Sequence, residues 1–235
     1  MDNAIAGRTL TTGLSARWPS LAYVLPFAVF LILLEFQKYI PLAAFVEYPL
    51  RLLILSTVLL VFSRHVIDLH SSHRIESVIL GVLVFVIWIG PDILFPAYRQ
   101  HWIFQNALVV VSSLPVPENV LMSPVVLASR ILRSILLVPI IEELFWRAWL
   151  MRWLISPRFE QVKLGAYAPA AFWATAVLFA SEHGSYWDVG LVAGILYNWW
   201  MVRTRSLGNC ILAHAVTNAC LCGYVVATHH WEYWL

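Results

Sequence analysis

The chain has 235 residues, of which 61% are hydrophobic and 12% are charged, and its mean hydropathy is +0.77. Soluble domains contain about 45–50% apolar and about 25% charged residues, so the composition excludes an ordinary soluble domain. The formal net charge is +2, and Lys and Arg are scattered at the ends of apolar segments, a pattern typical of membrane helices. We therefore predict an integral membrane protein with the lipid bilayer as its environment and with no nucleic-acid partner.

The apolar runs predict helices. Residues 78–87, for example, do not alternate between apolar and polar types as the strands of a membrane barrel do, and only helices and closed barrels satisfy the backbone in lipid. We predict an all-α fold, a polytopic transmembrane helical bundle in which residues 1–235 form a single domain of about eight helices. Their predicted ranges are 18–36, 48–63, 76–89, 125–138, 140–155, 166–183, 189–202 and 208–227.

Several segments interrupt this pattern. The first twenty residues are polar and lack a convincing small-residue cleavage site, which favours a retained first helix over a cleaved signal peptide. Residues 90–124 are rich in Pro and polar residues, and their one apolar run, 107–111, is too short to span a membrane. Pro139 is expected to separate two helices and to stand in the first turn of the second.

Small and polar residues in the C-terminal half are expected to serve packing. Gly190 and Gly194 form a small-xxx-small pair that lets two helices approach closely. Asn198 and Asn209 are interpreted as packing or helix-end polar groups. The three cysteines lie in one apolar segment, and their odd number indicates apolar fillers rather than a disulfide framework.

Two adjacent glutamates, Glu142 and Glu143, stand inside a strongly apolar stretch. Glu143 and Arg147 are four residues apart, so they share a helix face in the favourable order. Glu142 points about 100° away. We expect Glu143 and Arg147 to form a structural ion pair, which leaves Glu142 facing the bundle interior as a general base. The alternative is that both glutamates only pair with Arg147, Arg130 or Arg133.

Two further polar clusters follow in apolar surroundings. His183 ends a predicted helix, and Phe179 lies one turn earlier, where it would shield the imidazole from lipid. His214 and Asn218 are again four residues apart. An imidazole orients or activates water, or binds metal, and an amide donates to a developing oxyanion. The alternatives are an interfacial His183 and interhelical hydrogen bonds from His214 and Asn218.

In this order and in apolar helices, the three clusters resemble the CAAX protease and bacteriocin-processing family, which includes the type II CAAX prenyl endopeptidases. The motifs that carry the resemblance are Glu142-Glu143-Leu144-Phe145-Trp146-Arg147, Phe179-Ala180-Ser181-Glu182-His183 and His214-Ala215-Val216-Thr217-Asn218. It covers about 125–227, the family-like catalytic core. One departure is Ala148, since the family often has glycine after the motif arginine.

The resemblance implies a glutamic-type intramembrane endopeptidase. It would give Glu142 the role of activating water with help from His183, and His214 and Asn218 the role of stabilising the oxyanion. It implies supporting roles for the remaining motif residues, Glu143, Arg147 and Phe179.

Our functional hypothesis is hydrolysis of a peptide bond in a membrane-associated protein or peptide, prenylated or C-terminally processed by analogy with the family. The compact chain without a eukaryotic retention signal favours a bacterial inner (plasma) membrane. No cofactor is expected; the alternative is zinc held by Glu142, His183 and His214, although the sequence has no His-Glu-x-x-His motif. Two non-enzymatic alternatives are a membrane scaffold or immunity protein, and a transporter with a glutamate proton relay.

The predicted topology leaves one geometric question. It places Glu142 and His183 near one side of the membrane and His214 early in a helix entered from the other side. With a helical rise of about 1.5 Å per residue, this separates them by about 10 Å. A tilted helix, or a last helix that begins below the membrane surface, would remove the gap.

Overall fold

The computed structural model describes residues 17–36, 39, 42–105 and 116–234, and within these ranges the chain is helical and contains no strand. The predicted all-α fold is therefore confirmed, whereas the short apolar run 107–111 lies outside the described residues. The main helices are α2 (Leu21–Phe36), α3 (Ala44–Val58), α4 (Arg74–Leu94), α10 (Pro169–Ser181), α11 (Trp187–Thr204) and α12 (Leu207–Thr228).

A long central helix carries the glutamate pair. It comprises α7 (Pro124–Leu132), α8 (Val138–Glu143) and α9 (Met151–Trp153), joined by π-helical turns at Arg133–Leu137 and Leu144–Leu150. At about 1.5 Å per residue, its 30 residues extend for about 45 Å, which exceeds the hydrocarbon thickness of about 30 Å. The helix must therefore cross the bilayer obliquely or protrude from it.

The predicted separation of two helices at Pro139 is wrong, because the chain continues through this residue as one long helix. The predicted place of Pro139 in a first helical turn is confirmed, since it stands in the first turn of α8. The backbone N–H of Val138 donates to the carbonyl of Arg133, five residues earlier. In that wider register the carbonyl of Ser134 would require an N–H on residue 139, and proline has none. The π turn thus lets the helix continue although Pro139 has no backbone N–H. It leaves the Ser134 carbonyl free to accept a hydrogen bond from another group.

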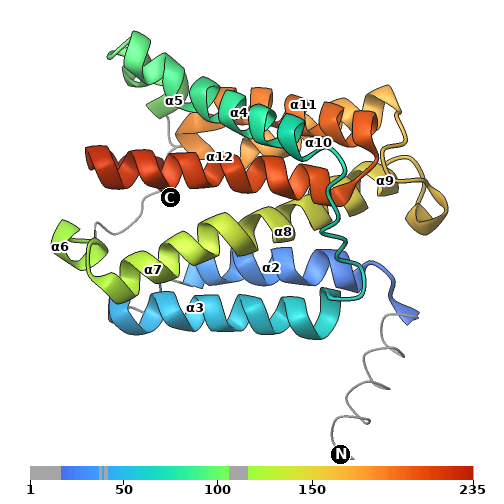
Figure 1. Ribbon diagram of the computed structural model, residues 1–235, viewed down its shortest axis with the longest axis horizontal. Helices are drawn as coiled ribbons and strands as arrows, with labels where there is room; N and C mark the ends of the chain where they lie inside the picture. Colours follow the sequence, from blue (N-terminus) through green and yellow to red (C-terminus); the bar gives the residue numbers. More distant parts are fainter. Residues whose placement is uncertain (1–16, 37–38, 40–41, 106–115, 235) are drawn as a thin grey trace, which may run out of the picture.

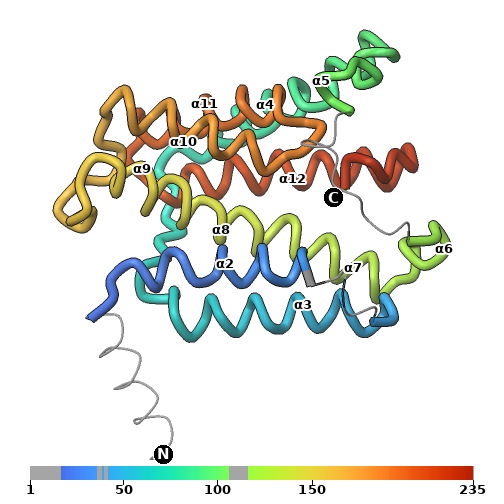
Figure 2. Tube along the Cα trace, turned by 180° about the vertical axis from the view of Figure 1, so that it is seen from behind, coloured from blue at the N-terminus to red at the C-terminus, as the bar shows by residue number. Residues whose placement is uncertain are grey.

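The helices form two groups with the long helix between them. Figures 1 and 2 show α2 and α3 side by side in one group and α4, α10, α11 and α12 in the other, with α7 to α9 crossing obliquely between them. In agreement, α7 packs against α3, and α8 packs against both α2 and α12. Glu142 and Glu143 are the last two residues of α8, in the middle of the long helix. They therefore lie where the two groups of helices meet.

The outer surface of the bundle suits lipid. Four described helices are long and apolar enough to cross a membrane, and α2 and α10 are shorter apolar helices. Large apolar side chains such as Leu53, Leu60 and Ile79 are more than 60% exposed on these helices. Because such side chains gain nothing from contact with water, we conclude that this is an integral membrane protein.

Glycines permit close contacts between helices in the C-terminal half of the bundle. A Cβ atom at Gly81 on α4 would collide with the Ala213 carbonyl of α12, so only glycine lets these two backbones touch. At Gly190 on α11, a Cβ atom would come within 3.1 Å of the Nδ1 atom of His183, and at Gly194 within 3.1 Å of the Ala176 carbonyl. The predicted small-xxx-small pair therefore does bring α11 close to α10.

The remaining elements are short and lie between the long helices. They are α5 (Trp102–Gln105), α6 (Glu118–Leu121) and the 3-10 turns Tyr98–Gln100, Phe159–Gln161, Gly184–Tyr186 and Trp231–Tyr233. The last of these turns follows α12 and returns the chain toward the interior, where Tyr233 and Trp234 are buried.

Candidate active site

A cavity of about 200 Å³ lies inside the bundle, and the four predicted catalytic side chains all line it. Glu142 reaches it from α8, His183 from the turn after α10, and His214 and Asn218 from α12. Phe179 lines the same cavity. Three segments that are distant in the sequence thus bring a carboxylate, two imidazoles and an amide to one cavity.

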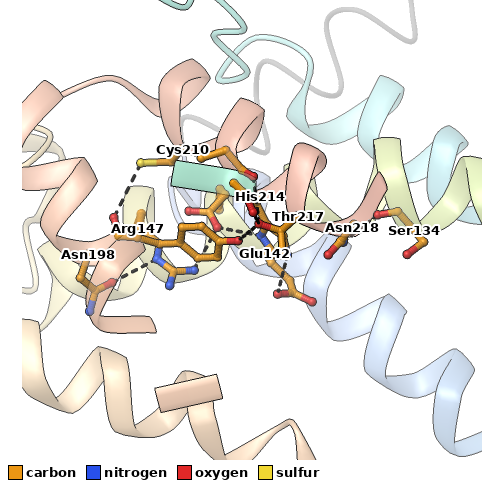
Figure 3. Close-up of polar contacts among 12 residues, drawn as sticks. Ser134, Glu142, Arg147, Asn198, Cys210, His214, Thr217 and Asn218 are labelled. Carbon is orange, nitrogen blue, oxygen red and sulfur yellow. Dashed lines mark hydrogen bonds and ion pairs between the residues drawn. The ribbon is translucent and has the colours of Figure 1, made fainter. Parts of the chain in front are cut away.

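Glu142 and His214 face each other in this cavity. Their Oε2 and Nε2 atoms are 4.0 Å apart, which is beyond hydrogen-bond distance, and Figure 3 shows the two side chains next to each other. Glu142 is only 7% exposed, and no described residue forms a hydrogen bond to its Oε2 atom. Both atoms are therefore available to a third group. The separation of about 10 Å raised by the predicted topology is absent.

Glu143 anchors the opposite nitrogen of the same imidazole. Its Oε1 atom accepts hydrogen bonds from the Nη1 atom of Arg147 at 3.0 Å and from the Nδ1 atom of His214 at 2.9 Å. The ion pair predicted from the spacing of Glu143 and Arg147 is thereby confirmed. Because an ionised carboxylate only accepts, the Nδ1 atom of His214 carries a proton and its Nε2 atom is directed at Glu142.

Arg147 is held on several sides. It is fully buried, its Nε atom donates to the Oδ1 atom of Asn198 at 3.0 Å, and the amide of Asn198 donates to the Phe172 carbonyl at 2.8 Å. The guanidinium group also lies 4.4 Å from the centre of the Phe179 ring. Asn198 therefore orients Arg147. The sequence did not reveal this role, because it indicated only a packing or helix-end polar group.

Tyr197 and Thr217 support His214 and were also missed. The Tyr197 ring stacks on the imidazole of His214 with centroids 5.1 Å apart. Its hydroxyl donates to the Oγ1 atom of Thr217 at 2.7 Å, and the Thr217 hydroxyl donates to the Gly81 carbonyl at 2.8 Å. Thr217 lies three residues after His214, a spacing that places both on one helix face, so its position was a usable signal. Tyr197 gave none.

His183 presents one nitrogen to the cavity. Its Nδ1 atom is 2.8 Å from the Phe179 carbonyl. A carbonyl only accepts hydrogen bonds, so Nδ1 is the protonated nitrogen and Nε2 remains as an acceptor. The rings of Phe179 and Trp88 lie 4.7 and 5.1 Å away. Phe179 thus covers the imidazole as expected, and Trp88 adds a second aromatic wall.

Asn218 is oriented by the irregular turn of the long helix. Its Nδ2 atom donates to the Ser134 carbonyl at 2.8 Å, the carbonyl that Pro139 leaves without a helical partner (Figure 3). An amide nitrogen has two hydrogens, so one N–H of Asn218 remains for the cavity that it lines. The proline and the asparagine, far apart in the sequence, therefore depend on each other.

The zinc alternative requires Glu142, His183 and His214 to surround one ion at about 2.0–2.2 Å. Among the residues that the structure describes, no group of three or more His, Cys, Asp or Glu side chains is placed to hold a metal ion. Metal dependence is therefore a question for experiment.

A family of known proteins matches part of the chain. Residues 124–220 match the family described as type II CAAX prenyl endopeptidase Rce1-like, and this segment contains all four predicted catalytic residues. No curated protein and no solved structure matches the chain. The resemblance to the CAAX protease family is thus confirmed over residues 124–220. It supports a membrane-embedded enzyme of the protease class.

Proposed function

We propose that this protein is an intramembrane endopeptidase in which Glu142 activates a water molecule. The observation that carries the proposal is the distance of 4.0 Å between Glu142 Oε2 and His214 Nε2, which is too long for a hydrogen bond, in a cavity that both residues line. Neighbouring Glu143 and Arg147 are bonded to each other. A buried carboxylate with an oxygen that accepts no hydrogen bond is costly, and a role as general base would explain why this cost is tolerated.

In the proposed reaction, Glu142 takes one proton from water while the oxygen attacks the carbonyl carbon of the scissile peptide. His183 accepts a hydrogen bond from the same water through its Nε2 atom. The negative charge on the carbonyl oxygen is stabilised by the free N–H of Asn218 and by His214 when it carries both protons, a state that Glu143 balances. Glu142 then passes its proton to the leaving nitrogen as the C–N bond breaks, so the proton count balances.

The proposed substrate is a membrane-associated protein or peptide that enters from the lipid. The cavity is lined largely by apolar and aromatic side chains, including Phe30, Leu31 and Leu34 of α2, so an apolar segment is the fitting ligand. A prenylated or C-terminally processed substrate and a bacterial inner membrane remain part of the proposal by analogy with the family.

Hydrolysis of lipidated, fluorogenic peptides by the protein in vesicles tests this function. We expect cleavage by the unaltered protein and none by Glu142→Ala or Glu142→Gln, while both variants keep their helical content and their unfolding temperature. A scaffold or immunity protein would instead retain its biological activity in both variants, and a transporter would show pH-coupled flux across the vesicle membrane. Full activity of Glu142→Gln in the peptide assay would refute a glutamate-dependent enzyme.

We also propose that the reaction needs no metal. Exhaustive chelation should leave peptide hydrolysis unchanged, because Glu142 alone accepts the proton of water. Complete loss of activity that added zinc restores would support the zinc-dependent form of the same enzyme.

A further inference from the structure

A groove of about 410 Å³ lies on the outside of the bundle between α4 and α11. None of the residues that line it lines the cavity of the candidate active site. Three of its apolar side chains, Ile79, Leu83 and Trp199, are 62%, 47% and 46% exposed, and α4 is long and apolar enough to cross a membrane. The groove therefore opens toward lipid.

The polarity of the groove changes along its length. His73 at the N-cap of α4 and Glu76 in its first turn lie at one end, and Arg203 lies in the last turn of α11. Ile79 and Leu83 continue the groove along α4, and Leu83 is seven residues beyond Glu76, or about 10 Å at 1.5 Å per residue. A polar end followed by an apolar length matches the headgroup and acyl chain of a phospholipid.

The polar residues of the two helices meet at the same end of the groove. The Trp200 ring of α11 lies edge-on to the imidazole of His73, with centroids 6.1 Å apart, and its Nε1 atom donates to the Ser77 hydroxyl of α4 at 3.1 Å. Arg203 follows Trp200 by three residues, a spacing that places both on one helix face. The guanidinium group of Arg203 therefore belongs to the same end as His73.

Two opposite charges at this polar end have no partner in the protein. The side chains of Glu76 and Arg203 are exposed and line the groove, and neither forms an ion pair or a hydrogen bond with a described residue. They are available to a ligand that offers one group of each sign, as a zwitterionic headgroup does. An anionic lipid would satisfy Arg203 but would repel the carboxylate of Glu76.

His73 adds a neutral donor to the same end. Its backbone N–H donates to the Oδ1 atom of Asn209 at 3.1 Å, and the Nδ2 atom of Asn209 lies 3.4 Å from the Nδ1 atom of the imidazole. An amide nitrogen only donates, so Nδ1 of His73 accepts and Nε2 carries the proton. Asn209 thus leaves His73 with an N–H for the groove that it lines.

We propose that this groove binds one phospholipid with an ethanolamine headgroup. Its phosphate accepts hydrogen bonds from Arg203 and from the Nε2 atom of His73, and its ammonium group donates to Glu76. One acyl chain lies along Ile79 and Leu83 and covers their apolar surface. Choline has no N–H donor and glycerol has no positive charge, so neither headgroup satisfies the carboxylate. The inference is independent of the proposed function, since it holds whether or not the protein is a protease.

A comparison of lipids on the unaltered protein tests the headgroup. The probes are phosphatidylethanolamine, phosphatidylcholine and phosphatidylglycerol with identical acyl chains, and their binding to the detergent-solubilised full chain is measured by native mass spectrometry. We expect one molecule of phosphatidylethanolamine to bind about 10-fold more tightly than either other lipid, because only it forms the charged hydrogen bond with Glu76. Equal binding of the three lipids, or a preference for phosphatidylglycerol, would overturn the proposal.

Variants identify the residues responsible. Glu76→Gln should remove the preference for phosphatidylethanolamine over phosphatidylcholine, and Arg203→Met should weaken the binding of both lipids by about 10-fold, because they share the phosphate. Glu160→Gln and Arg158→Met are matched controls, since these residues are exposed and lie outside the groove. The comparison of lipids on the unaltered protein stays decisive if a variant does not fold. An unchanged preference in a folded Glu76→Gln would assign the ammonium group to another residue and refute our inference.

The headgroup without its acyl chains separates a lipid site from a site for soluble phosphate compounds. Glycerophosphoethanolamine carries the same phosphate and ammonium groups but cannot cover Ile79 and Leu83. We expect no saturable binding of it at concentrations at which phosphatidylethanolamine saturates the protein, because the apolar contacts are missing. Binding as tight as that of the intact lipid would show that the apolar part of the groove holds nothing, and would refute a phospholipid site.

Discussion

Two adjacent carboxylates of one helix have opposite surroundings. Glu143 is fully buried, and its Oε1 atom receives hydrogen bonds from both Arg147 and His214. The Oε2 atom of each glutamate receives no hydrogen bond from any described residue, but only Glu142 lines the cavity. Glu143 belongs to a hydrogen-bonded network with Arg147 and Asn198, which we call the closed network. Glu142 belongs to the residues that line the cavity with His183 and Asn218, which we call the open set.

The difference arises from helix geometry. Successive residues are rotated by about 100°, so one side chain points into the contact with α11 and α12 while its neighbour points into the cavity. His214 joins the two regions, because one nitrogen contacts Glu143 and the other faces Glu142. The closed network thus fixes the orientation of an imidazole that the open set uses.

The largest expected effect comes from substituting each glutamate separately. Glu142→Gln should lower peptide turnover by about 10²–10⁴-fold, as for loss of a general base, without a fall in the unfolding temperature. Glu143→Gln should instead lower stability by about 3–5 kcal/mol, because Arg147 loses its buried partner. Parallel measurements of turnover and chemical unfolding check both. If the two variants lost turnover and stability to the same extent, the proposed difference between Glu142 and Glu143 would be refuted.

The corresponding comparison of two asparagines should give a smaller effect. Asn218→Ala removes a proposed oxyanion donor and should lower turnover by about 10²–10³-fold. It also leaves the Ser134 carbonyl without its partner, which should cost about 0.6–1.7 kcal/mol of stability. Asn198→Ala leaves the Nε atom of Arg147 and the Phe172 carbonyl unpaired and should cost about 1.5–3 kcal/mol of stability. The same two assays apply, and a stability loss confined to Asn218→Ala would contradict the assignment.

The fold was largely predictable from sequence, because long apolar runs leave few alternatives in lipid. The continuation of the long helix through Pro139 could not be predicted from the sequence. The π turn at Arg133–Leu137 is accompanied by tertiary contacts such as the hydrogen bond from Asn218 to the Ser134 carbonyl. Propensity alone treats proline as a helix end, and an amide arriving from α12 is invisible in the local sequence.

The site was predictable where its residues share a helix. The pair of Glu143 and Arg147 follows from a spacing of four residues, and the structure forms it. The hydrogen bond from Arg147 to Asn198 joins two residues that are 51 positions apart and lie on different helices. No sequence periodicity connects such positions. The predicted catalytic roles of Glu142, His183, His214 and Asn218 stay predictions until turnover is measured.

The smallest expected effect concerns the contact that supports His214 from behind. Thr217→Val removes the hydroxyl that links Tyr197 to the Gly81 carbonyl, and interhelical hydrogen bonds in membranes contribute about 0.6–1.7 kcal/mol. We expect a stability loss of that size, because Tyr197 keeps its stacking on His214. Thr217→Ser is the matched control, since it retains the hydroxyl and should keep both stability and turnover. A turnover loss in Thr217→Val as large as that in Glu142→Gln would show that Thr217 belongs to the open set rather than to the support of His214.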